Sequence, residues 1–465
     1  MQDKMFTNEK DESELFRNQN KWYFLVLLCL SSLGYLYNSQ AIPTLQVPLE
    51  KEMGLDELAY SRLLIAEAIP GFLFLLVGGY LVDYFGAVKS FLASSVIIVL
   101  GQIICTIAAY KYSFLLFVLG KIVLVIAGES AMLSRTKIIR MWYSNNELGR
   151  SMGSMVVMAT VATIICDLAY PNLYQAKQSL GLPFLVGVIV CVASVYFSVK
   201  CVQLHQDMLN LKVTIDNESE GNKGVSYKSL MELPAIFWMI VFAVSWTMIG
   251  AALVKIYQSK FLQTEYHYTV GEAGYFLAFS QVMTAIATPL AGIIADKTQK
   301  ATLSMIVSIG LIQVSTLLNI SIPRCEKCLW PAVPIVVTSC AVGPLMMMAY
   351  SSVMKLMDEK VMGMVTSMVP ILIGGQMVIF ATVAGYIANA TVDVYGYKYV
   401  FILSLVIGLF GLALSVYLHY FDLNNGKRLQ HHKNSLKGLL EMKLLGKSSE
   451  KKQTDEGDRE MTERV

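Results

Sequence analysis

Twelve long apolar runs make up most of this 465-residue chain. A helix needs about 20 apolar residues to cross the roughly 30 Å hydrocarbon core of a bilayer, and each run is long enough. Because 55% of the residues are apolar and only 15% are charged, the composition is not that of a soluble globular protein. The sequence predicts an all-α polytopic membrane protein with transmembrane helices near residues 22–44, 61–82, 89–110, 113–134, 149–171, 182–204, 235–257, 271–295, 301–322, 331–353, 362–388 and 397–421.

One long polar stretch, residues 205–234, divides the runs into two groups of six. We expect it to be a cytoplasmic linker between a six-helix bundle over residues 22–204 and another over residues 235–421. An N-tail (1–21) and a C-tail (422–465) with the composition of a disordered segment complete the chain. Of the 37 Lys and Arg residues, 27 lie on the side of the two termini, mostly in the tails and linker, and 8 on the opposite side. Both termini are therefore predicted to be cytoplasmic.

Five ionisable side chains inside the predicted spans are candidates for the transport path, because a charge there is costly unless it faces protein or a water-filled cavity. They are Glu67, Lys121, Glu129, Asp167 and Lys255. Glu129 is the deepest, about two-thirds of the way through the fourth span from its outer end. It is either a buried acid compensated by an internal partner or the principal negative charge of a substrate site, and we favour the substrate site. Lys255 lies near an outer helix end, where snorkelling towards water is the favoured interpretation.

Lys121 precedes Glu129 by eight residues. This spacing puts the two about 80° apart around the helix and about 12 Å apart along it, so they cannot form a tight pair. They can instead bind opposite ends of a zwitterion, with an ammonium at Glu129 and a carboxylate at Lys121. Glu67 shares a stripe of the second span with Gly71 and Gly78, and small residues favour close helix packing. We therefore expect Glu67 to face protein or a cavity rather than lipid.

Uncharged polar side chains inside the spans complete the predicted substrate site. In the first half, Tyr35 and Asn38 are three residues apart and share a helix face. In the second half, Trp246, Gln281 and Gln376 supply polar atoms without charge. The charge of the predicted site is thus concentrated in the N-terminal bundle.

The loop after the second span has a partial copy six spans later. Gly79, Asp83, Gly86 and Lys89 form the first copy, and Asp296 occupies the position of the acid in the second. This spacing resembles the loop signature of the major facilitator superfamily, whose fold is two six-helix bundles. The resemblance implies a conformational latch on the cytoplasmic side, in which an anion at the loop meets the start of another helix.

We expect Asp83 to lie beside the start of the eleventh span, near residues 361–363, and Asp296 beside the start of the fifth, near residues 148–150. The sequence departs from the signature at two positions. Tyr84 and Ala87 stand where the family usually has basic residues.

Further motifs resemble the lysosomal dipeptide transporter branch of this superfamily. Leu119-Gly120-Lys121 is followed by Ala127-Gly128-Glu129-Ser130 in the fourth span. The resemblance implies a uniporter working by alternating access, which moves small cationic or zwitterionic peptides from lysosome to cytosol without a cofactor. Glu129 would contact the amino end or a basic side chain of the peptide. The branch has an Arg in the fifth span where this chain reads Met158-Ala159-Thr160-Val161-Ala162, so Lys121 would have to substitute for it.

The same resemblance implies a lysosomal membrane, with the plasma membrane as the alternative, and a glycosylated accessory membrane protein as a partner. Other small solutes, such as an organic anion or a sugar, remain open as substrates. An alternative function of a different class is that of a sensor or scaffold that does not transport a solute. An enzyme is not expected, because no nucleophile with a base, metal cluster or phosphate-cradling loop is apparent. No metal and no nucleic-acid partner are expected either.

Eight cysteines are scattered along the chain, and only Cys325 and Cys328, in the outer loop between spans nine and ten, have the spacing of a pair. A single C-x-x-C is weak evidence for zinc. Two free thiols are favoured here over a disulfide.

Overall fold

The computed structural model describes residues 2–143, 145–210, 235–298, 301–356 and 362–424, and every regular element in these ranges is a helix. The first half contains α1 (Gln2–Leu30), α2 (Leu33–Ser39), α3 (Ala41–Thr44), α4 (Gln46–Met53), α5 (Glu57–Phe85), α6 (Ala87–Lys111), α7 (Phe114–Trp142), α8 (Asn145–Lys177) and α9 (Gly181–Asn210). The second half contains α11 (Ala235–Glu265), α12 (Val270–Thr298), α13 (Ala301–Ser321), α14 (Ala332–Leu356), α15 (Met362–Tyr395) and α16 (Lys398–Asn424).

Eleven helices of the described part are long and apolar enough to cross a membrane. The first predicted span is not one of them, because it is divided between α1, α2 and α3 rather than forming one continuous helix. At the first break, the hydroxyls of Ser31 and Ser32 donate to the carbonyls of Leu28 and Cys29, both at 2.6 Å. Side-chain bonds of this kind compete with the backbone ladder of a helix. The divided segment still packs against α8 and α9, in the place of the first span.

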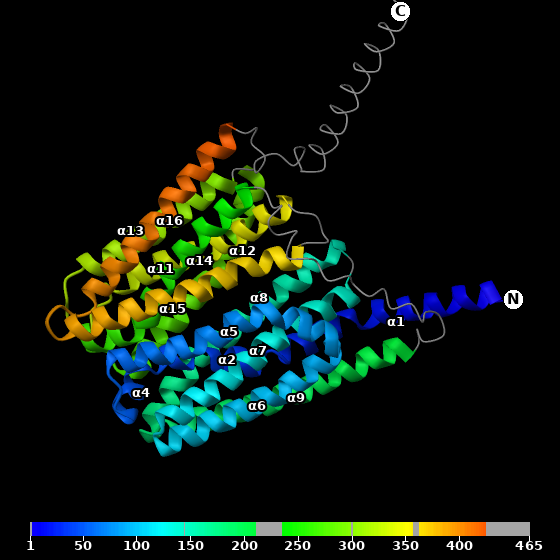
Figure 1. Cartoon of the computed structure of the whole chain (residues 1–465), viewed down its shortest axis with the longest axis horizontal. Helices are drawn as coiled ribbons and strands as arrows, with labels where there is room; N and C mark the ends of the chain where they lie inside the picture. Colours follow the sequence, from blue (N-terminus) through cyan, green and yellow to red (C-terminus); the bar gives the residue numbers. More distant parts are fainter. Residues whose placement is uncertain (1, 144, 211–234, 299–300, 357–361, 425–465) are drawn as a thin grey trace, which may run out of the picture.

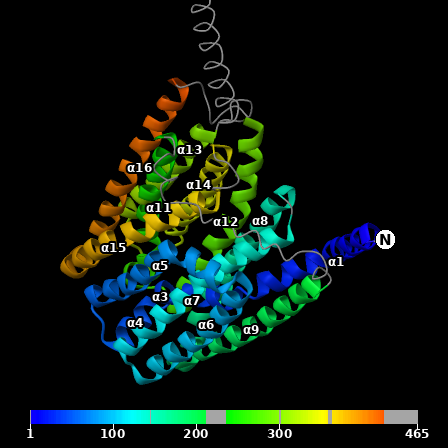
Figure 2. The ribbon, with the colours of Figure 1, turned by 45° about the vertical axis from the view of Figure 1, so that its right-hand side comes forward.

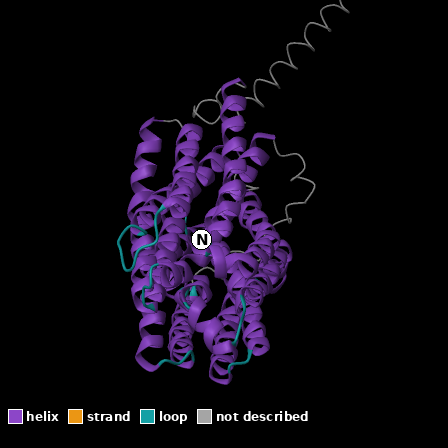
Figure 3. Ribbon diagram, turned by 90° about the vertical axis from the view of Figure 1, so that its left-hand side faces the viewer, coloured by secondary structure: helices purple, strands orange, loops and turns teal. Residues whose placement is uncertain are grey.

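The helices form two groups that follow the order of the chain (Figures 1 and 2). In the first half α6 packs against α7 and α9, and α5 packs against α7. In the second half α11 packs against α16, and α14 packs against α12 and α13. The halves meet chiefly where α5 lies along α15 and α8 lies along α12. Figure 3 shows that short loops join long, roughly aligned helices.

The predicted boundaries at the linker and tails differ from those of the helices. Residues 205–210 continue α9 instead of beginning the linker, and α1 begins at Gln2, inside the predicted N-tail. The rest of the predicted linker and nearly all of the predicted C-tail lie outside the described residues.

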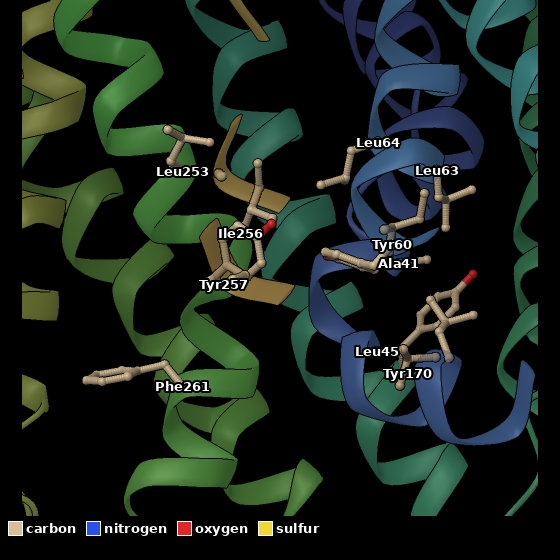
Figure 4. Packing of buried hydrophobic residues seen from close by; sticks show 14 of the residues in the cluster. Ala41, Leu45, Tyr60, Leu63, Leu64, Tyr170, Leu253, Ile256, Tyr257 and Phe261 are labelled. Atoms are coloured by element: carbon tan, nitrogen blue, oxygen red, sulfur yellow. The ribbon is translucent and has the colours of Figure 1, made fainter. Parts of the chain in front are cut away.

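The buried apolar side chains form separate cores at the predicted cytoplasmic end and a shared one at the predicted outer end. Phe24, Trp142 and their neighbours belong to the first half alone, and Phe237, Leu345 and theirs to the second half alone. At the outer end one cluster takes residues from both halves (Figure 4). The halves thus share a core at the predicted outer end and have independent cores at the predicted cytoplasmic end. With the termini cytoplasmic as predicted, this corresponds to an inward-facing arrangement.

The outer loop between α13 and α14 corrects one expectation. Cys325 and Cys328 form a disulfide, where the sequence favoured two free thiols. The chain turns back on itself between them, with Lys327 at φ 49°, and brings their Cα atoms to 5.8 Å. Cα atoms at this separation are within the normal range for a bridge.

Candidate functional site

Glu129 is held in place by Tyr35. The phenol hydroxyl of Tyr35, on α2, donates to Oε1 of Glu129, on α7, at 3.0 Å. The Tyr35 ring lies directly on Gly128, because a Cβ at that glycine would come within 2.1 Å of the ring. The glycine therefore allows α2 and α7 to approach closely enough for the hydrogen bond. Two of the predicted site residues, Tyr35 and Glu129, are thus brought together.

Lys121 lies in a different environment, on the same helix. Its Nζ is 3.4 Å from Oε1 of Glu67, on α5, and donates to the backbone carbonyl of Asn38 at 3.2 Å. The Lys121 side chain is 2% exposed and that of Glu67 is 19% exposed. Lys121, Glu67 and Asn38 therefore meet, and the ammonium already has an anionic partner. Binding a substrate carboxylate there would mean sharing Lys121 with Glu67.

The side chain of Asn38 is bonded to other helices. Its amide nitrogen donates to the carbonyl of Gly34 at 2.7 Å and contacts Sγ of Cys191 at 3.2 Å. Its amide oxygen accepts a hydrogen bond from the hydroxyl of Tyr170. These bonds tie α2 to α8 and α9, so the Asn38 side chain connects helices, and its backbone carbonyl is the group that reaches Lys121.

The predicted residues of the second half form no single cluster with those of the first. Trp246 packs against Phe380 and Phe410, with ring centroids 5.4 and 4.7 Å away. The amide nitrogen of Gln376 donates to Ser245 at 3.3 Å, and its amide oxygen is buried without a partner among the described residues. Gln281, on α12, is half-buried. Within the described residues, no hydrogen bond or ion pair links Gln281 to the other predicted site residues.

Asp167 and Lys255 attract each other across the two halves. Asp167, on α8, is 2% exposed and accepts a hydrogen bond from the hydroxyl of Thr44 at 2.7 Å. Lys255, on α11, is half-buried and interacts electrostatically with Asp167. The charge of Lys255 thus interacts with an acid of the opposite bundle, and snorkelling stays an interpretation from the sequence.

Arg135 is a residue that the sequence reading missed. The predicted fourth span ended at residue 134, whereas α7 continues to Trp142 and leaves Arg135 only 3% exposed. Its Nε has no hydrogen-bond partner among the described residues, and Glu129 and Tyr35 act on it electrostatically. The seven-residue spacing of Lys121, Gly128 and Arg135 along one helical stripe is the signal that would have found it.

The predicted latch lies mostly outside what the structure describes. The side chains of Asp83 and Asp296, and residues 357–361, are not described. Gly86 joins α5 to α6 with φ at 85°, a conformation that favours glycine. The carbonyl of Gly79 accepts a hydrogen bond from Nζ of Lys137 at 3.1 Å, and Lys89 is exposed. The latch stays a prediction.

Within the described residues no group of three or more His, Cys, Asp or Glu side chains could hold a metal ion. The ionisable residues of the site are instead single charges distributed over several helices. Such an arrangement can bind a charged solute.

Comparison with known proteins agrees with this geometry. Over residues 24–375 the chain matches the family described as Major Facilitator Superfamily. It is 22% identical over 344 residues to the lysosomal dipeptide transporter MFSD1 of Danio rerio, covering 69% of this chain and 74% of that protein. The Homo sapiens MFSD1 is 21% identical over 347 residues, with the same coverage of 69% and 74%.

Solved structures show the same fold. A bacterial homolog of the human lysosomal transporter Spinster, in an inward-facing and occupied conformation, matches with a TM-score of 0.62 at 14% identity, over 88% of this chain and 98% of that one. The nucleoside transporter NupG matches with a TM-score of 0.66 at 14% identity, over 85% and 99%. The family match, the relatives and the two-bundle architecture agree that the chain is a multi-pass membrane transporter, not an enzyme. It belongs to the Major Facilitator Superfamily.

Proposed function

We propose that this transporter carries small zwitterionic or cationic peptides, dipeptides in particular, from the lysosome to the cytosol as a uniporter. The observation that carries the proposal is Glu129, an acid within the membrane that Tyr35 orients. An acid in this position attracts an ammonium group, and the curated relatives are named as lysosomal dipeptide transporters.

Uptake into proteoliposomes tests the substrate directly. The panel contains dipeptides, free amino acids, sugars and organic anions, each offered with and without a proton gradient. We expect the dipeptides to be transported and the gradient to be unnecessary. Glu129→Gln keeps the shape and removes the charge, so it should abolish uptake at a near-normal protein level. Glu272→Gln, which changes an acid paired with Lys327 at the outer surface, is the matched control.

An organic anion is the second candidate, and a specific observation favours it. Lys121 and Arg135 are two buried cations on α7, and Arg135 lacks an ion pair among the described residues. If anions are the substrates, Glu129→Gln should retain uptake while Arg135→Gln loses it. A non-transporting sensor would instead move nothing from the panel, in any variant, and its C-terminal tail should retain a binding partner.

The lysosomal location and an accessory partner belong to the same proposal. They are supported by the names of distant relatives and by the resemblance described above. Imaging of the tagged full chain against lysosomal and plasma-membrane markers tests the location. Purification in mild detergent should recover a glycosylated membrane protein in a fixed ratio if the partner exists.

A further inference from the structure

A charged cluster closes the predicted outer end of the molecule. Lys260, on α11, forms ion pairs with both Glu50, on α4, and Glu57, on α5. The hydroxyl of Tyr397, just before α16, donates to Oε1 of Glu57 at 2.6 Å. The side chains of Lys260, Glu50 and Glu57 are only 13, 10 and 7% exposed. We call Glu50, Glu57, Lys260 and Tyr397 the gate cluster.

The gate cluster joins the two halves of the protein. Its two acids belong to the first half, and Lys260 and Tyr397 belong to the second. Next to it lies the shared apolar cluster of Figure 4, in which the rings of Tyr60 and Tyr257 are 6.1 Å apart. An outward-facing state requires the halves to separate here, so the ion pairs of the cluster must break in every transport cycle.

The cluster has an unbalanced charge. Two carboxylates share one ammonium, which leaves a net charge of minus one in a site largely shielded from water. Oε2 of Glu57 is also buried without a hydrogen-bond partner among the described residues. A buried charge that is not fully compensated is costly, and a bound proton would remove it.

The other groups around Glu50 do not restore the balance. Gln46, on the same helix, donates to Oε1 of Glu50 at 2.9 Å and carries no charge. Tyr60 of α5 and Tyr257 of α11 also interact with Glu50 and are neutral as phenols. The short helix α3 contributes no titratable side chain.

We propose that closing the outer gate takes up one proton at Glu50, beside the second carboxylate of the gate cluster, so that acid on the outer side favours the inward-facing conformation. The inference adds a regulatory proton site to the proposed transporter and rests on its alternating access. It does not depend on which solute is carried.

The direction of the effect follows from the environment of Glu50, which lies in α4, outside the membrane spans. Burial raises the pKa of Glu50 from 4.5 to about 6, against the opposing effect of Lys260. With the gate open, the carboxyl faces water and its pKa returns towards the ordinary value. The closed state therefore binds the proton more tightly, and acid favours closing. The equilibrium constant for closing should rise as the pH falls through 6 and level off below 4.5, by a factor on the order of 30.

Distances between two spin labels measure this equilibrium without any substrate. Lys111→Cys, at the outer end of α6, and Trp330→Cys, before α14, place one label on each half. Both positions are exposed, whereas the six free cysteines are buried or half-buried. In the reconstituted full-length protein, the ratio of short to long distances should rise roughly 15-fold between about pH 7.5 and about pH 4.5, and approach the full factor of about 30 only at lower pH.

Three variants identify the proton site. Glu50→Gln mimics the protonated acid, and Glu57→Gln removes the second carboxylate that shares Lys260, so each should fix the ratio near the acid value of the parent and flatten its pH dependence. Glu52→Gln removes the same charge from α4 at an acid bonded to Tyr174 of its own half, and should keep the pH dependence. Glu129→Gln should keep it too, while losing substrate, which separates this inference from the proposed substrate site.

A parent protein whose distances do not change with pH, or open in acid, would overturn the proposal. Equal flattening by Glu52→Gln and Glu50→Gln would do the same, since the effect would then be one of overall charge.

Discussion

At the scale of single residues, the bond between Tyr35 and Glu129 is the contact most directly tied to the proposed site. Tyr35→Phe removes a hydrogen bond to a carboxylate and keeps the ring on Gly128. Such a bond contributes about 1.5–3 kcal/mol, so the KM for the carried peptide should rise roughly tenfold or more. Tyr37→Phe is the control, because the Tyr37 hydroxyl is buried without a partner among the described residues and should be dispensable. Equal KM values in the two variants would show that the Tyr35 hydroxyl does not contribute to substrate binding.

Two cations compete for the substrate carboxylate, and masking that group as an amide distinguishes them. Amidation of the substrate should weaken uptake strongly in the parent protein. It should weaken uptake little in a variant that lacks the cation that binds the carboxylate. Lys121→Ala tests the residue predicted from the sequence, and Arg135→Gln tests the one that lacks an ion pair in the described structure. Because Lys121 is already paired with Glu67, we expect Arg135→Gln to be the insensitive variant. If amidation reduces uptake by both variants as much as by the parent, neither residue binds the substrate carboxylate.

At the scale of elements, the position of α7 depends on its close crossing with α6. A Cβ at Gly101, on α6, would lie 2.9 Å from the backbone nitrogen of Leu124, on α7. Gly101→Val should therefore push the helices apart and destabilise the protein by about 1–3 kcal/mol, because overpacking forces backbone shifts. Thermal unfolding in detergent measures the change. At Gly310, on α13, a Cβ would meet nothing within 4 Å, so Gly310→Val should leave the unfolding temperature nearly unchanged.

At the scale of the whole molecule, Asp83 is the residue predicted to close the cytoplasmic side. If Asp83 meets the start of α15 in the outward-facing state, Asp83→Asn removes a contact worth about 0.3–1 kcal/mol when exposed and up to about 2 when partly buried. The population should then shift inward, and a reporter at Thr136→Cys, seven residues after Glu129, should label faster. Asp207→Asn, an exposed acid at the inner end of α9, is the control. Parent-like labelling of Asp83→Asn would argue against the latch.

The two-bundle helical fold and the transporter family could be predicted from the sequence, and so could eleven of the twelve spans; the first is divided between α1, α2 and α3. Each depends on apolar runs and short motifs that are local in the chain. A bilayer makes such local patterns decisive, because every backbone polar group must be satisfied inside its own helix. The acid at Glu129 could also be recognised locally, since any charge at that depth is conspicuous.

The partners of these charges could not be predicted, because they come from other helices. Tyr35 of α2 donates a hydrogen bond to Glu129 of α7, and Lys121 forms an ion pair with Glu67 of α5. The gate cluster joins α4 and α5 to Lys260 of the other bundle, more than 200 positions along the chain, and no local pattern marks it. Hydrophobic length thus determined that the chain crosses the membrane many times. Only the tertiary structure decided which charges meet, because pairing depends on the rotation and depth of whole helices relative to one another.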